Sequence, residues 1–125
     1  MIKYVVKPPF VDLVVTGDNP NADLRRVILQ IADDARVPYD ALLLIDGRKS
    51  TAMPSHADTQ ERFGYFRVLT NRVLPLCAVI VSPARRLAVG SVYELEGAGK
   101  GGMRLKVFTS ITDGRKWLRA EARKC

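Results

Sequence analysis

Short apolar runs alternate along the chain with stretches in which apolar residues recur at helical spacing. The runs at 2–6 and 10–15 are separated by Pro8 and Pro9, neither of which can donate a hydrogen bond within a β-ladder. Two strands this close in sequence are most simply antiparallel neighbours, so we predict an N-terminal hairpin. The runs at 41–45 and 77–81 are continuously apolar, which is typical of central strands covered on both faces.

The clearest helical pattern follows the hairpin. One face of this predicted helix holds Leu24, Val27, Ile28, Ile31 and Ala35. Pro38 ends the helix, because the residue before a proline avoids the helical conformation. A second helix is expected at about 58–73, with Phe63, Phe66, Leu69 and Val73 on one face and Pro75 closing it.

The last third of the chain repeats this alternation. We expect a short helix at 87–95, a strand at 104–108 and a final helix capped by Thr112 or Asp113. The element order is then ββαβαβαβα. Such an order predicts an α/β fold with a mostly parallel sheet of four or five strands, an antiparallel N-terminal hairpin and helices packed on the sheet. The length predicts a single domain over 1–125.

Composition agrees with an ordinary globular protein, since 47% of the 125 residues are apolar and 26% are charged. No apolar run reaches the roughly 18–20 residues of a membrane span, and the first residues lack the apolar core of a signal peptide. Cys77 lies in an apolar run and Cys125 is the last residue, so we expect no disulfide framework. A reducing, cytoplasmic location is the simplest expectation.

Few residues suit catalysis or metal binding. His56 is the only histidine, so metal sites and catalytic sets that need paired histidines are excluded. The glycines of 97–102 satisfy G-x-G-x-x-G, but they follow a predicted helix and open a strand, which is the reverse of a dinucleotide-binding context. Asp46 ends a buried strand, where structural hydrogen bonding is the simpler interpretation. We therefore predict no catalytic residues, no metal and no cofactor.

Positive charge is concentrated after residue 46. The formal net charge is +7, and residues 47–125 hold 15 of the 20 Lys and Arg but only 6 of the 13 Asp and Glu. Such a balance favours anionic partners, although it also serves solubility. Lys116, Arg119 and Arg123 line up on the last helix, either as a ligand-facing stripe or as its solvated face. Basic residues interleaved with aromatics, as in nucleic-acid platforms, are absent.

Polar and basic residues also follow the two central strands. In an open parallel sheet, ligands bind beyond the carboxyl ends of the strands. If the third and fourth strands are neighbours, one rim gathers these side chains, and it becomes a candidate site for an anion or an acidic partner. Its candidate residues are Arg48, Lys49, Ser50, Thr51, Ser82, Arg85 and Arg86. The alternative is that these charges only solubilise the loops.

The succession of elements resembles the small bacterial STAS-like or SpoIIAA-like domains. The resemblance rests on the opening hairpin, the strand at 42–48 with its Asp46-x-Arg48 exit, the aromatic helix at 63–73, and the closing strand and helix at 106–118. It implies a four- or five-stranded sheet with helices largely on one side and a non-enzymatic regulatory role. It also implies a phosphoacceptor serine before the helix after the central strand. Ser55 lies in that region, although its neighbours do not match the Asp-Ser-Ser-Gly-like turn of the family.

These observations predict a cytoplasmic regulatory domain that binds a protein partner without catalysis. An alternative class is a carrier of lipid or another apolar ligand, since relatives of the family bind apolar ligands and one helix concentrates Phe63, Tyr65, Phe66 and Leu69. Nucleic-acid binding is the third interpretation. A homodimer is also expected, because two-fold dimers are the commonest assemblies, but the sequence names no interface.

Overall fold

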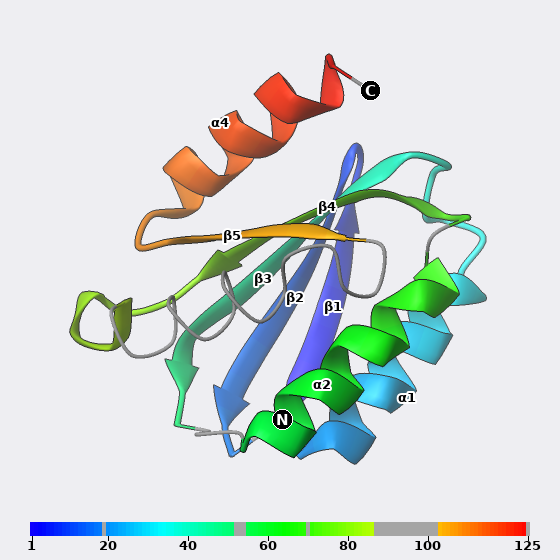
Figure 1. Cartoon of the computed structure of the whole chain (residues 1–125). Coiled ribbons are helices and arrows are strands. Elements are labelled where there is room, and N and C mark those ends of the chain that lie inside the picture. Colours follow the sequence, from blue (N-terminus) through cyan, green and yellow to red (C-terminus); the bar gives the residue numbers. More distant parts are fainter. Residues whose placement is uncertain (19, 52–54, 70, 87–102, 125) are drawn as a thin grey trace.

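A five-stranded sheet forms the centre of the computed structural model, which describes residues 1–18, 20–51, 55–69, 71–86 and 103–124. Its strands are arranged in the order β1-β2-β3-β4-β5 (Figure 1). The first pair is antiparallel, and all later neighbours are parallel. The strands are β1 (Ile2–Lys7), β2 (Phe10–Gly17), β3 (Ala41–Ser50), β4 (Val73–Ile80) and β5 (Arg104–Phe108). The predicted hairpin and the mostly parallel sheet are thus confirmed.

Helices cover both faces of the sheet (Figure 1). On one face lie α1 (Asn21–Ala32) and α2 (His56–Tyr65), and α2 continues as the 3-10 helix η1 (Phe66–Leu69). On the other face lies α4 (Ile111–Ala122). The expectation that helices lie largely on one side therefore holds for α1 and α2 but not for α4. The predicted helix at 87–95 and the glycines of 97–102 lie outside the described residues.

Two apolar clusters, one on each face, form the core. The larger cluster joins α1 and η1 to the sheet. It buries four of the five residues predicted for the apolar face of the first helix: Leu24, Val27, Ile28 and Ile31. The smaller cluster lies under α4 and includes Leu44, Ile80 and Leu118. Because both faces of β3 and β4 are covered, their apolar runs need no polar alternation.

The first predicted helix is too long at its C-terminal end. α1 ends at Ala32, and Ala35 is exposed rather than part of the helical face. Arg72 accounts for the early end, because its guanidinium donates to the carbonyl oxygens of Ala32, Asp34 and Val37 at 2.7–2.8 Å. A side chain thus satisfies carbonyls that another helical turn would otherwise bond.

The second predicted helix is also too long, because Val73 opens β4 rather than closing a helix. Pro75 lies inside that strand, which the sequence pattern did not predict. The register explains why the proline is tolerated. Ala41 faces Val73 but Leu43 faces Cys77, so the pairing is irregular around Pro75. Pairing with β5 begins only at Leu76, and Pro75 is exposed.

The N-terminus of α4 differs slightly from the prediction. Ser110 is the N-cap, and its hydroxyl accepts a hydrogen bond from the backbone N–H of Asp113 at 3.4 Å. The helix therefore begins at Ile111, one residue before Thr112. Within the described ranges, every helix falls short of the length and apolar character that a bilayer crossing requires.

Two contacts fasten α4 to the sheet. Gly114 lies so close to β4 that an added Cβ would be 2.8 Å from Ile80 Cδ1 and 3.4 Å from Ala78 Cβ. The next residue, Arg115, forms a bidentate ion pair with the buried Asp12 of β2, at 3.0 and 2.6 Å. The Arg115 guanidinium also lies over the ring of Phe10, 4.6 Å from its centroid.

Candidate functional site

The carboxyl ends of β3 and β4 meet at one edge of the molecule, as the sequence analysis required. The two strands are parallel neighbours, and Asp46 faces Ile80. The chain after β4 forms the short 3-10 helix η2 (Pro83–Arg85). From there Arg85 donates its Nη1–H to the backbone carbonyl of Ser50 at the end of β3. The structure therefore brings together the two basic segments that are far apart in sequence.

β3 extends further than predicted and carries Arg48, Lys49 and Ser50 as strand residues rather than loop residues. The extension is possible because β2 continues beside it, so that Thr16 faces Lys49 and Gly17 faces Ser50. Thr51, just beyond the strand, donates its backbone N–H to the carbonyl of Gly17 at 3.0 Å. The pairing with β2 thus fixes the backbone of the β3 end.

A bulge lies within this extension. Between Val14 and Thr16 of β2, β3 advances by three residues, from Asp46 to Lys49. Gly47 suits the bulge, because an added Cβ would lie 3.3 Å from the carbonyl oxygen of Ile80. Bulges re-aim the side chains beside them, and here Arg48 turns back onto Asp46.

Asp46 and Arg48 form a close ion pair. Arg48 donates from Nε to Oδ1 at 2.9 Å and from Nη2 to Oδ2 at 2.8 Å. Partial burial by itself raises the pKa of the Asp46 carboxyl, but the hydrogen bonds and charge of Arg48 outweigh burial, so this pKa lies below its ordinary value. The structural interpretation of Asp46 agrees with this contact. The pair also offsets the charge of Arg48, which the sequence analysis counted in full.

The remaining candidates at this end differ in exposure. Lys49 is exposed, whereas Arg85 and Arg86 are half-buried. Ser82 precedes η2, and its carbonyl oxygen accepts a hydrogen bond from the backbone N–H of Arg85 at 3.0 Å. We refer to Lys49, Arg85 and Arg86, with the Asp46–Arg48 pair beside them, as the basic rim.

Ser55 is the N-cap of α2. Its hydroxyl oxygen accepts a hydrogen bond from the Asp58 backbone N–H at 3.1 Å, and the Asp58 carboxylate accepts one from the Ser55 backbone N–H at 3.3 Å. This reciprocal capping box sets the start of the helix. A structural role for Ser55 is therefore visible, and its role as a phosphoacceptor stays a prediction.

Side chains that the sequence analysis did not single out tie α1 to α2 near the same end. Asn21 donates from Nδ2 to Glu61 Oε2 at 3.1 Å and to the carbonyl of Asp58 at 3.2 Å. Arg62 donates in turn to Asn21 Oδ1 at 2.6 Å. The partners are about 40 residues apart, so no local pattern could have revealed them.

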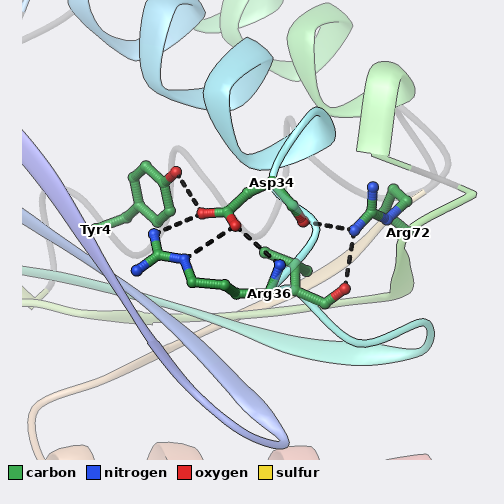
Figure 2. A network of polar contacts seen from close by, with 5 residues as sticks. Tyr4, Asp34, Arg36 and Arg72 are labelled. Carbon is green, nitrogen blue, oxygen red and sulfur yellow. Dashed lines mark hydrogen bonds and ion pairs between the residues drawn. The ribbon is translucent and has the colours of Figure 1, made fainter.

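A second polar cluster surrounds Asp34, where α1 leads into the turn before β3 (Figure 2). Tyr4 donates its hydroxyl to Asp34 Oδ2 at 2.8 Å, and Arg36 donates to both carboxylate oxygens at 3.0 and 2.7 Å. The hydrogen bonds from Arg36 hold the pKa of Asp34 well below its ordinary range. Partial burial, followed by the contact with Asp34, raises the pKa of Tyr4. The cluster orders the turn and leaves no group poised for proton transfer near neutral pH.

Cys77 and three apolar side chains of α2 and η1 belong to the interior. Burial raises the pKa of the Cys77 thiol to about 12, so it is not a nucleophile at neutral pH. Phe63 and Phe66 are only 3% and 5% exposed, and Leu69 is fully buried. Three of the four side chains that suggested an apolar cleft thus pack in the core, whereas Tyr65 is half-buried and donates its hydroxyl to Glu61. Among the residues with described positions, no group of three or more potential ligands could hold a metal ion.

Comparisons with known proteins identify the class of fold. No family model matches the chain, and no curated protein matches it. Among solved structures, the chain is similar to an uncharacterized protein of the DUF3478 family with a SpoIIAA-like fold from Shewanella loihica PV-4. The TM-score is 0.60 at 13% identity, and the likeness covers 94% of this chain and 92% of that chain. The chain therefore has the SpoIIAA-like α/β fold that its sequence resembles.

Proposed function

We propose that this protein is a regulatory, non-enzymatic domain that binds a protein partner in the cytoplasm and recognises an anionic group of that partner at the basic rim. The observation that carries the proposal is the contact from Arg85 to the Ser50 carbonyl. It holds the segment after β4 against the end of β3, so that positive charges from both segments face the same ligand.

The charges at the rim favour an anion. Lys49 is exposed on a strand end whose backbone is held by β2. Arg85 is the last residue of the short helix beside it, and Arg86 is the C-cap of that helix. Guanidinium and ammonium groups donate strong hydrogen bonds to carboxylate and phosphate oxygens. Arg48 contributes little further charge because Asp46 offsets it.

The interior supports a non-catalytic role. Cys77 is protonated and buried, and His56 is the only histidine of the chain. The buried free thiol also suits a reducing compartment. These features favour recognition over bond-making chemistry.

The proposal is tested by titrating the ¹⁵N-labelled protein with inorganic phosphate and following backbone amide shifts. The largest shifts are expected at the end of β3 and in η2. The double variant Lys49→Ala with Arg85→Ala should weaken phosphate binding by roughly tenfold, which corresponds to ~1.4 kcal/mol. An unchanged melting temperature would show that the variant is folded.

The matched control is Arg119→Ala with Arg123→Ala, which removes the same charge from an exposed position of α4 and from its exposed C-cap. Binding should survive this change. If phosphate binding weakens equally in both double variants, the effect comes from net charge alone, which would contradict a site at the basic rim. The absence of shifts at the β3 end in the unmodified protein would contradict it directly.

A further inference from the structure

The sheet has two edge strands, β1 and β5, and β1 has no neighbour on its outer side among the strands that the structure describes. Met1 and Thr16 exchange both backbone hydrogen bonds, at 2.7 and 2.9 Å. Hydrogen-bonded pairs alternate along an antiparallel ladder, so Lys3, Val5 and Lys7 bond to β2. The backbone N–H and C=O groups of Ile2, Tyr4 and Val6 therefore point outward from the sheet edge.

Apolar side chains border this open edge. Of the large apolar residues exposed in the structure, Met1 (61%) and Val5 (48%) lie on or next to β1, and Leu29 (44%) lies on the adjoining surface of α1. Between β1 and α1 runs an open groove of about 960 Å³, lined by Tyr4, Arg25, Arg26, Leu29 and Asp33 among others. Unpaired backbone, exposed apolar groups and a groove thus coincide along one strand.

We propose that a second copy of this chain occupies this edge, with the two β1 strands paired antiparallel about a two-fold axis at Tyr4. In this register Ile2 faces Val6 of the partner subunit, Tyr4 faces Tyr4 of the partner subunit, and Lys3 faces Val5 of the partner subunit. The pairs on the α1 face are apolar or aromatic, which stabilises antiparallel strands.

Charge selects this register over the nearest alternative. A different register, with the two-fold axis at Val5, would also pair side chains that lie on the same face of the sheet. It would place Lys3 of each copy opposite Lys7 of the partner subunit, so the like-charge contact would occur twice. Like charges directly opposite each other destabilise a strand pair. The register centred on Tyr4 avoids this contact and still pairs five residues of each β1.

α1 adds a second complementary surface. The two-fold operation reverses the direction of α1, so the end with Arg25 and Arg26 lies towards Asp33 of the partner subunit. These three side chains line the groove and make no ion pair with other described residues. A stable interface buries roughly 1,200–2,000 Å² in total, more than two short strands supply, and closing the groove between the helices provides the additional area.

The proposal is tested by sedimentation equilibrium over a range of protein concentrations, with the 13.9 kDa monomer as reference. Val5→Lys sets a lysine opposite Lys3 of the partner subunit, and we expect the dimer dissociation constant to rise at least tenfold. Adding Lys3→Glu to Val5→Lys restores an attractive pair at both symmetric positions and should recover most of the affinity. Val14→Lys is the matched control, because it adds the same charge on the same sheet face but on β2.

A backbone variant tests the edge itself. Val6→Pro removes an N–H that points away from β2, so the monomer should fold while the dimer is lost. Circular dichroism checks the fold. A wild-type protein that stays at 13.9 kDa at 100 µM and above would overturn the proposal, and so would a dimer that Val5→Lys and Val6→Pro leave unchanged. Neither outcome bears on phosphate binding at the basic rim, so the two proposals fail independently.

Discussion

Single residues that fasten the fold are mostly paired over long distances in sequence. Asp12 and Arg115 are separated by 103 positions, and Arg72 bonds carbonyls 35 to 40 positions away. No local periodicity encodes such pairs, so the sequence analysis did not predict them. Asp46 and Arg48 are only two positions apart, and the sequence shows them in an Asp-Gly-Arg strand exit. The spacing did not predict that the two side chains form an ion pair, which offsets the charge of the arginine.

The Asp12–Arg115 ion pair is expected to stabilise the protein measurably. Asp12 is 6% exposed, and Asp12→Ala leaves the Arg115 guanidinium without its carboxylate partner in a half-buried position. We expect the free energy of unfolding in urea to fall by about 1–3 kcal/mol. Arg119→Ala is the control, because Arg119 lies over the same Phe10 ring, 5.2 Å from its centroid, and makes no ion pair with another described residue. If Asp12→Ala costs no more stability than Arg119→Ala, the ion pair contributes no more than a single contact with the ring.

At the scale of elements, the apolar pattern correctly predicted which main helices and strands exist in the described part of the chain, but it misplaced several of the residues at which they begin or end. The face of α1 and the continuous runs of β3 and β4 were correct because burial on these faces leaves a clear periodic signal. The errors at Ala35, at Pro75 and at the end of β3 share one cause. Each boundary is set by a partner elsewhere in the fold: Arg72, an irregular register, or the continued β2 strand.

Two helical glycines should respond in opposite directions to substitution. Gly114 is packed against β4, and the methyl groups of Gly114→Val would meet Ile80 and Ala78, so we expect a loss of about 1–3 kcal/mol in the free energy of unfolding. Gly64 is exposed in α2 and has no atom within 4 Å of an added Cβ. Gly64→Ala should therefore raise the free energy of unfolding by ~0.5–1 kcal/mol. Thermal or urea denaturation of both variants checks the contrast, and destabilisation by Gly64→Ala would contradict it.

At the scale of the whole molecule, alternation of strands and helices was enough to predict the fold class and the adjacency of β3 and β4. Sequential strands joined by helices usually pair in parallel, which brings their carboxyl ends together. The same reasoning could not tell that α4 crosses to the opposite face. That choice depends on Gly114 and Arg115 meeting β4 and β2, which is a tertiary fit rather than a periodic pattern.

Burial of Cys77 makes the stability of the whole fold sensitive to alkaline pH. The thiol ordinarily has a pKa of 9.0, and burial raises it to about 12 in the folded chain. Above pH 9 the unfolded chain loses this proton while the folded chain keeps it, so the free energy of unfolding falls as pH rises from 9 towards 12. The contribution is at most ~1.4 kcal/mol per pH unit.

Cys77→Ala separates this contribution from other alkaline titrations. Urea denaturation of the wild type and the variant at pH 8, 9 and 10 gives the difference in stability at each pH. We expect the advantage of the wild type to shrink above pH 9. A constant difference across this range would mean that the Cys77 thiol ionises in the folded chain as readily as in the unfolded chain.

The three carbonyl contacts of Arg72 have a consequence for how the chain opens. The last turn of a helix commonly frays on its own, independently of the rest of the fold. Here the carbonyls of Ala32, Asp34 and Val37 are held by the side chain of Arg72. Arg72 immediately precedes β4, which is an inner strand of the sheet. Fraying at this end of α1 therefore requires release of a guanidinium anchored beside a buried strand. The end of α1, the turn that follows it and the start of β4 thus form one cooperative unit, which opens together or not at all.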